Sequence, residues 1–157
     1  MKTAQATTAL FVFWLVLTGS FAPVELISGA LLSVALGAWG ARVLWPEDSP
    51  AITPRQALRF VLFIPHLLAS VLMAALQVAE VVLDPRMPIE PHLMNHRTSF
   101  TRPASRVLYA NSITLTPGTI TVDVDDDTFC IHCLAERFAD EIATGELEDR
   151  VAHVFEG

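Results

Sequence analysis

The chain has 157 residues, of which 52% are hydrophobic, and its formal net charge is −7 at pH 7. This apolar fraction exceeds that of an ordinary soluble domain, and the acidic balance argues against nucleic-acid binding. The charges are distributed unevenly: residues 1–83 hold four acidic and four basic residues, whereas residues 84–157 hold thirteen acidic and six basic ones. We therefore expect membrane helices over residues 1–83 and a small, water-facing α+β domain over residues 84–157.

The first two apolar segments, at about residues 5–21 and 26–44, are close to the ~20 residues that cross a bilayer. The connection between them is short and contains Pro23, so the two helices are predicted to form a tight antiparallel hairpin. Lysine and arginine residues flank this hairpin and are missing from its turn, which favours a cytoplasmic position for both of its ends.

Small residues recur along the second predicted helix at Gly29, Ser33 and Gly37. Such residues let a neighbouring helix approach closely within lipid. The plain alternative is that glycine is simply common in membrane helices. Glu25 lies at the start of this helix, where the positive end of the helix dipole favours a carboxylate, so we interpret it as an interfacial cap and not as an ion site.

A third apolar segment covers residues 55–83, after a proline-containing linker at residues 45–50. It differs from the first two because its polar residues are separated by sums of threes and fours, which places them on one stripe of a helix. The stripe consists of Arg55, Arg59, His66, Ser70, Gln77, Glu80 and Asp84. Either this helix spans the bilayer with the stripe against other subunits, or it lies in the membrane interface with its apolar side down.

The two interpretations of the third segment differ in topology. A third span carries the C-terminal domain to the outside, whereas an interfacial helix leaves it in the cytoplasm. The free cysteines Cys130 and Cys133 favour the reducing, cytoplasmic side.

Residues 84–157 have the pattern of a small α+β domain. Its predicted elements are an edge strand over 87–95, a helix over 103–113, two hairpin strands over 119–124 and 128–133, and a helical segment over 135–155 that is interrupted at Gly145. Pro117 and Gly118 predict a type II turn, because glycine supplies the positive φ that follows proline there.

Three sequence patterns resemble functional sites, but none of them supports catalysis or metal binding. Cys130 and Cys133 are three apart in an alternating strand, so they face opposite sides about 10 Å apart along the chain and cannot share a disulfide or a metal. The acidic run at residues 123–127 lacks the later calcium ligands of an EF-hand loop, and we interpret it as a hairpin turn. His132 is interpreted as a structural or interface residue. We predict no catalytic residue, cofactor or metal site.

One segment is specific enough to suggest a family. Residues 109–124 read YANSITLTPGTITVDV, and residues 82–87 read VLDPRM. With the two N-terminal apolar segments, they resemble the E subunit of the Mrp/Mnh-type multisubunit monovalent-cation/proton antiporters of bacteria. The resemblance implies a small subunit of a plasma-membrane complex whose large, complex-I-like subunits carry the ion pathways. It implies no catalytic residue at any position here.

The first hypothesis is therefore an accessory or assembly subunit of a Na⁺/H⁺ antiporter, in contact with the other subunits and with the lipid bilayer. The alternative is a membrane-anchored adaptor or sensor whose acidic domain recruits a soluble partner; a remote third is a membrane enzyme with an unrecognised site. The structural and interface candidates are Gly29, Ser33, Gly37, His66, Gln77, Glu80, Asn111, Pro117, Gly118 and His132.

Overall fold

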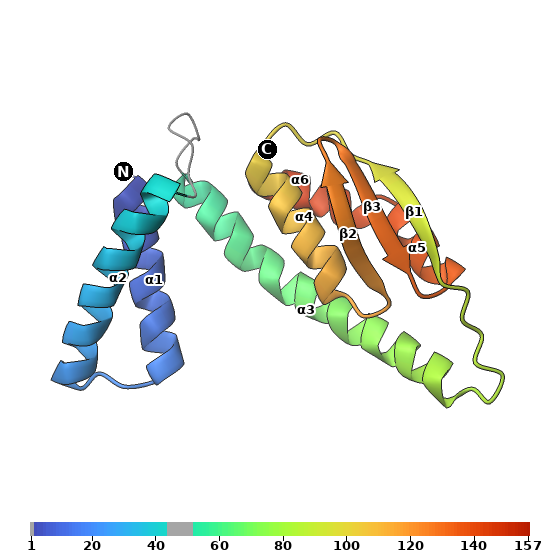
Figure 1. Cartoon of the computed structure of the whole chain (residues 1–157), viewed down its shortest axis with the longest axis horizontal. Helices are drawn as coiled ribbons and strands as arrows, with labels where there is room; N and C mark the ends of the chain where they lie inside the picture. Colours follow the sequence, from blue (N-terminus) through green and yellow to red (C-terminus); the bar gives the residue numbers. More distant parts are fainter. Residues whose placement is uncertain (1, 44–51) are drawn as a thin grey trace. The chain divides into compact units, whose positions relative to one another are not determined.

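The computed structural model of this chain describes residues 2–43 and 52–157. These residues form two compact units, which divide between residues 53 and 54. The first contains helices α1 and α2, and the second contains helix α3 together with the whole α+β region (Figure 1). The predicted linker at residues 45–50 and the predicted end of the second membrane segment at residue 44 lie outside the described residues.

The first unit is the predicted helical hairpin. Helix α1 covers Lys2–Thr18 and ends before Gly19, whose φ of 59° leaves the helical region. Helix α2 covers Pro23–Val43. Proline is favoured at the first position of a helix because its fixed φ suits the helix and its missing N–H has no partner there. The first helix therefore ends three residues before the predicted boundary at residue 21, and Pro23 begins the second helix.

The small residues of α2 lie against α1. A Cβ atom added at Gly29 would overlap the indole ring of Trp14, and one added at Gly37 would overlap Thr7. Ser33, between them, is only 3% exposed. Trp14 also donates a hydrogen bond from Nε1 to the carbonyl of Glu25 at 3.0 Å. Close approach to a neighbouring helix thus occurs within this chain, with α1 as the neighbour.

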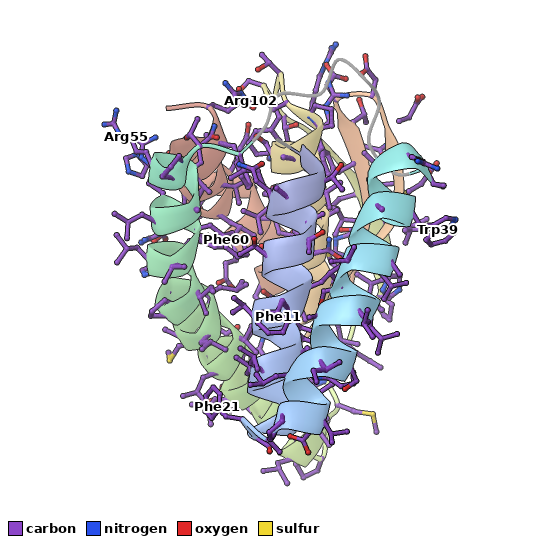
Figure 2. All side chains as sticks on the ribbon, turned by 90° about the vertical axis from the view of Figure 1, so that its left-hand side faces the viewer. Phe11, Phe21, Trp39, Arg55, Phe60 and Arg102 are labelled. Atoms are coloured by element: carbon purple, nitrogen blue, oxygen red, sulfur yellow. The ribbon has the colours of Figure 1, made fainter. Side chains whose placement is uncertain are left out.

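Two of the described helices are long and apolar enough to cross a membrane. They are α2, over Pro23–Gly40 with a mean hydropathy of 1.4, and α3, over Pro54–Leu83 with a mean hydropathy of 2.1. The apolar part of α1, Thr3–Thr18, is shorter. Trp39 of α2 is 62% exposed and points away from α1 (Figure 2), as expected for a side chain in lipid.

Helix α3, Pro54–Leu83, belongs to the same compact unit as the α+β region. The predicted domain boundary between residues 83 and 84 stays a prediction, and the compact units divide before α3. The physical reason is that α3 contributes to the core of that region: Phe63 is 6% exposed within the main hydrophobic cluster, and Leu67 packs against it. The sequence alone grouped α3 with the membrane helices because its overall hydropathy resembles theirs.

The α+β region is built on a three-stranded antiparallel sheet of β1 (His92–Arg97), β2 (Thr119–Asp125) and β3 (Thr128–Cys133), in the order β1-β3-β2. The predicted hairpin of β2 and β3 is confirmed, and β1 is an edge strand as expected. However, β1 begins at His92 instead of residue 87. Pro88 and Pro91 precede it, and proline cannot donate a ladder hydrogen bond.

Three helices complete this region: α4 (Pro103–Leu115), α5 (Glu136–Ala143) and α6 (Glu146–Phe155). The predicted break at Gly145 is confirmed, since its φ of 74° separates α5 from α6. The core consists mainly of Phe63, Phe100, Tyr109, Ile113, Phe129, Ile131, Cys133, Ile142, Val151, Val154 and Phe155.

The sheet has one covered and one open face. Phe129, Ile131 and Cys133 of β3 are each 0% exposed and point into the core. The residues between them point the other way, where His132 lies between Leu93 of β1 and Ile120 of β2. Leu93 is 61% and Ile120 is 53% exposed, so this face of the sheet carries apolar side chains that the described residues do not cover.

The predicted turn at Pro117 and Gly118 is confirmed. Gly118 has a φ of 97°, and the N–H of Thr119 bonds to the carbonyl of Thr116 at 3.3 Å. The structure adds a second requirement for glycine: a Cβ atom at this position would lie 2.8 Å from the ring of Phe138. Both the backbone angle and the space beside it therefore exclude a side chain.

We predict that Gly118→Ala lowers the free energy of unfolding by about 2–4 kcal/mol, because it combines a left-handed backbone with an overpacked contact. Gly145→Ala is the matched control. Its φ is also positive, but nothing lies within 4 Å of the added Cβ, so only about 1–2 kcal/mol is expected. Denaturant unfolding of both variants in detergent measures the difference, and equal losses would show that the Phe138 contact yields without cost.

Candidate functional site

The N-terminal part of α3 contacts α6 through one residue of the polar stripe, Arg59, and through Gln56, which lies outside the stripe. Gln56 donates a hydrogen bond from Nε2 to the carbonyl of Phe155 at 3.1 Å. Arg59 donates from Nη1 to the carbonyl of His153 at 3.0 Å and also to the carbonyl of Gly157. The carbonyl groups at the end of α6 lack helical partners, and these α3 side chains supply donors to them.

The C-terminal part of the stripe lies beside α5. Arg137 donates a hydrogen bond from Nη2 to the carbonyl of Gln77 at 2.5 Å, and the same guanidinium lies 3.9 Å from the carboxylate of Glu80. The Glu80 side chain is 77% exposed, so this ion pair adds little stability. Polar contacts therefore join both ends of α3 to the α+β region, with the apolar contact of Phe63 and Leu67 between them.

These contacts identify the surroundings of the stripe. We expected five residues of the stripe to face polar surroundings, either headgroups and cytoplasm or a neighbouring subunit: Arg59, His66, Ser70, Gln77 and Glu80. The Arg59 side chain and the backbone carbonyl of Gln77 contact the α+β region of the same chain, because α6 packs along α3 and Arg137 of α5 reaches the helix. Arg55, at the start of the helix, is exposed and projects outward (Figure 2).

His66 lies in a groove between α3 and α6 that has a volume of 390 Å³. Its lining residues are Arg59, Leu62, Phe63, His66, Asp149, Arg150, His153 and Val154. Beside it, Arg150 donates to Glu146 at 2.6 Å. That hydrogen bond and the charge of Arg150 hold the pKa of Glu146 below its ordinary value, and the nearby His66 contributes in the same direction. Arg150, which lines the groove, is thus paired with a carboxylate of its own helix.

Threonine side chains hold residues 109–124, the segment that suggested the family, in place. Thr119 donates from Oγ1 to the carbonyl of Ile113 at 2.8 Å, and Thr121 donates to the carbonyl of Ala110 at 3.1 Å. The N–H of Thr121 in turn bonds to Oγ1 of Thr114 at 3.2 Å. The threonine hydroxyls therefore join the end of α4 to the start of β2. This local role explains the run of threonines around the Pro117–Gly118 turn.

The acidic run between β2 and β3 is a hairpin turn, as predicted, and its carboxylates bind arginines. Asp127 accepts a hydrogen bond from Nε of Arg97 at 2.7 Å, and Asp126 accepts one from Nη1 of Arg106 at 2.8 Å. The bond from Arg97 lowers the pKa of Asp127. These pairs connect the turn to β1 and α4, and they leave the two carboxylates engaged with side chains of the same chain.

The cysteines lie on opposite faces of β3, as the alternation predicted. Cys133 is fully buried, whereas Cys130 is half-buried on the open face. Among residues 2–43 and 52–157, no group of three or more histidine, cysteine or acidic side chains has the arrangement of a metal site. The exposed Asn111 donates to the carbonyl of Val107 within its own helix. The interface roles of Asn111 and His132 stay predictions.

The structure shows a carboxylate at the N-terminus of α4 that no sequence pattern predicted. Glu156 accepts hydrogen bonds from the N–H groups of Thr101 and Arg102, at 3.2 and 3.0 Å, and from the hydroxyls of Thr101 and Ser105, at 2.5 and 2.7 Å. It thereby accepts hydrogen bonds from donors at the N-terminus of α4. The N-cap residue of this helix, Arg102, makes no capping hydrogen bond with its own side chain. Glu156 lies more than 50 positions away in the chain, so no local sequence pattern indicates this contact.

A second contact of the same kind joins β1 to α6. Glu148 accepts the N–H of Ser99 at 3.1 Å, and its other carboxylate oxygen lies 3.0 Å from Nε2 of His96. His96 in turn lies beside the buried ring of Tyr109, with 5.9 Å between the ring centroids. Glu148 and Glu156 both lie on or next to α6, so this helix binds α3 on one side and the β1–α4 connection on the other.

These features define a class of protein: a chain with two apolar helices of membrane-spanning length, α2 and α3, and a small α+β region with a three-stranded antiparallel sheet. Comparison with known proteins gives the family. Residues 7–154 match the family model for the Na⁺/H⁺ ion antiporter subunit. The chain therefore belongs to this family of antiporter subunits, and it is a component of a transporter and not an enzyme.

Individual relatives agree with the family assignment. The chain is 32% identical over 123 residues to the Na⁺/H⁺ antiporter E1 subunit of Staphylococcus saprophyticus subsp. saprophyticus, covering 78% of this chain and 74% of that protein. It is 30% identical over 128 residues to the E1 subunit of Staphylococcus aureus strain Newman, covering 82% and 78% of the two chains. A chain of the membrane-bound sulfane sulfur reductase, an archaeal respiratory membrane complex, has a similar fold, with a TM-score of 0.77 and 35% identity over 98% of this chain and 99% of that one.

The Glu156 contacts predict a pH dependence. Partial burial acts to raise the pKa of Glu156, but the four hydrogen bonds outweigh it and lower the pKa below the ordinary value of 4.5. The stabilisation is therefore present above pH ~4.5 and is lost as pH falls through the lower, folded-state pKa. Glu156→Gln should reduce the free energy of unfolding by about 1 kcal/mol at pH 7 and by less at pH 3–4.

Unfolding of the wild-type chain and the variant at pH 7 and at pH 3.5 measures this effect. Glu141→Gln is the control, because Glu141 is an exposed carboxylate of α5. A loss for Glu156→Gln that is the same at both pH values would contradict the capping role of the ionised carboxylate.

Proposed function

We propose that this chain is an accessory and assembly subunit of a multisubunit monovalent-cation (Na⁺)/proton antiporter in the bacterial plasma membrane, and that it is not itself the ion pathway. One observation carries the proposal. An ion path needs several ionisable groups aligned across the membrane. Helices α1 and α2 hold Lys2 and Arg42 near their outer ends and Glu25 in the first turn of α2, with none between.

On α3, the Arg59 side chain donates a hydrogen bond to the end of α6, and the backbone carbonyl of Gln77 accepts one from Arg137 of α5, so both contacts support a structural role for this helix. The partners that fit the proposal are the other antiporter subunits, including large, complex-I-like membrane proteins that carry the pathways. Gly29, Ser33, Gly37, His66, Gln77, Glu80, Asn111, Pro117, Gly118 and His132 are then residues that maintain the shape of the subunit or its contacts.

We predict that Glu25→Gln leaves transport intact. The carboxylate lies in the first turn of α2, and its Oε2 is buried without a hydrogen-bond partner among the described residues. Complexes purified in mild detergent through a tag on this chain report assembly, and Na⁺-dependent proton flux in inverted vesicles reports transport. Flux per assembled complex and the apparent affinity for Na⁺ should match the wild type.

The matched variant is Gly29→Leu, which forces a side chain into the space of the Trp14 ring. It should lower the amount of assembled complex and leave the flux per remaining complex unchanged. Normal assembly of Glu25→Gln with abolished flux would place this chain in the ion pathway and overturn the proposal.

The alternative of a membrane-anchored adaptor is favoured by the open face of the sheet, where Leu93, Ile120 and Val122 are 53–61% exposed. Such a face suits a protein partner. The same purification separates the two functions. Recovery of large membrane subunits with the chain supports the antiporter, whereas recovery of one soluble protein without them supports the adaptor.

The proposal places the α+β region in the cytoplasm, which Arg42, Arg55 and Arg59 near the ends of the helices favour. We predict that a membrane-impermeant maleimide labels Cys130 in inverted vesicles and not in intact cells. Cys133 should stay unlabelled, because it is fully buried and burial raises the pKa of its thiol. Phe21→Cys, at a 75% exposed position in the turn between α1 and α2, should show the opposite sidedness. Labelling of Cys130 in intact cells would place the region outside.

A further inference from the structure

One side of α3 is a continuous apolar surface. Its leucines at positions 58, 62, 68, 72, 76 and 83 are each 56–81% exposed. At about 1.5 Å per residue, this row extends about 38 Å along the helix. Soluble monomers rarely expose an apolar surface of such length, so something apolar covers it.

The opposite side of α3 is covered along most of the helix. Contacts with the α+β region begin at Gln56, which bonds to Phe155, and continue to Gln77 and Glu80, which lie against Arg137. Between them, Phe63 and Ala74 are 6% and 1% exposed. The helix is therefore amphipathic, with its own α+β region on one side and bare leucines on the other.

This arrangement is incompatible with a third membrane span. A spanning α3 would carry the α+β region into the hydrocarbon along with it, because the two are joined over most of the length of the helix. Arg137 and Glu80, and the charged Asp149 and Arg150 of the groove beside α3, would then lie at the depth of the acyl chains. Ionised groups on an outer protein surface are strongly disfavoured there.

The exposed side also differs from a surface that binds another membrane helix. Helix α2 shows what such a surface looks like in this chain, since Gly29 and Gly37 lie directly against α1. Small residues of this kind allow close packing in lipid. Helix α3 contains no glycine, and its exposed row consists of leucines that favour fluid acyl chains over a fixed groove.

Chain connectivity also favours lipid as the covering medium. Ten residues separate the end of α2 at Val43 from the start of α3 at Pro54, and a fully extended chain of this length reaches about 35 Å. The exposed leucine row of α3 is therefore tethered within this reach of α2, which is itself apolar and long enough to cross a membrane.

We propose that α3 lies in the plane of the membrane surface, with its leucine row in the acyl chains of the bilayer and the α+β region on the aqueous side. The attachment is hydrophobic, because residues 84–157 are strongly acidic and an anionic lipid surface would repel them. A zwitterionic bilayer therefore suffices. The proposal concerns how the chain meets lipid, and it is independent of the assembly function proposed above.

Site-directed spin labelling tests the proposal on the full chain, with one copy in each phosphatidylcholine nanodisc. Single nitroxides replace Leu58, Leu68, Leu76 and Leu83 in a Cys130→Ala background, where the buried Cys133 does not react. Val107→Cys, at a 60% exposed position on α4, is the aqueous control. Accessibility to oxygen and to a water-soluble nickel complex gives the depth of each label.

All four α3 labels should lie at a similar depth, about 5–10 Å below the lipid headgroups, with higher oxygen and lower nickel accessibility than the Val107 label. A depth that rises to about 15 Å at Leu68 and falls again at both ends would show a transmembrane helix and overturn the proposal. Nickel accessibility equal to that of the control at all four positions would show that the leucine row faces water, and would overturn it as well.

Discussion

The packing of α3 against the α+β region is the interaction on which the rest of the second unit depends. It combines apolar burial at Phe63 with hydrogen bonds from Gln56 and Arg59 to the carbonyls at the end of α6. Burial provides the larger free energy, since a side chain the size of phenylalanine contributes about 2–3 kcal/mol when it is removed from water. The hydrogen bonds fix the position of α3 along α6, because the carbonyl groups at the end of α6 have no partners within their own helix and accept donors only where these carbonyls lie.

Helix α6 connects α3 to the remainder of the fold. Its apolar side supplies Val151, Val154 and Phe155 to the core, and the carboxylates of Glu148 and Glu156 hold the connection between β1 and α4. One short helix therefore contacts both α3 and the N-terminus of α4. Residues 109–124 continue these contacts to β2 through the threonine hydrogen bonds.

The two units use different physical means to stabilise helices in contact. In the hairpin of α1 and α2, glycine lets Trp14 lie directly on the backbone of α2, and the close approach increases dispersion contacts where no hydrophobic effect operates between lipid-exposed helices. In the second unit, larger side chains such as Phe63 and Tyr109 are removed from water. The first unit is therefore held together by close backbone approach, and the second by a conventional hydrophobic core.

The sequence by itself determined the local features, because their signals lie within a few residues. Apolar runs marked α1 and α2, alternation marked β2 and β3, and the glycines marked the Gly118 turn and the break at Gly145. It also indicated the family, through one long specific segment, and the opposite faces of Cys130 and Cys133. The start of β1 was placed too early because a proline-rich segment has no hydrogen-bonding pattern of its own.

Only the tertiary structure decided which unit α3 belongs to and what its polar stripe contacts. Amphipathic periodicity shows that a helix has two sides, but the same pattern suits headgroups, another subunit or a domain of the same chain. The choice depends on partners such as Phe155, His153 and Arg137, which lie 60 or more positions away in the sequence. The Glu156 cap was hidden for the same reason, since a carboxylate and the helix it caps come together only when the chain has folded.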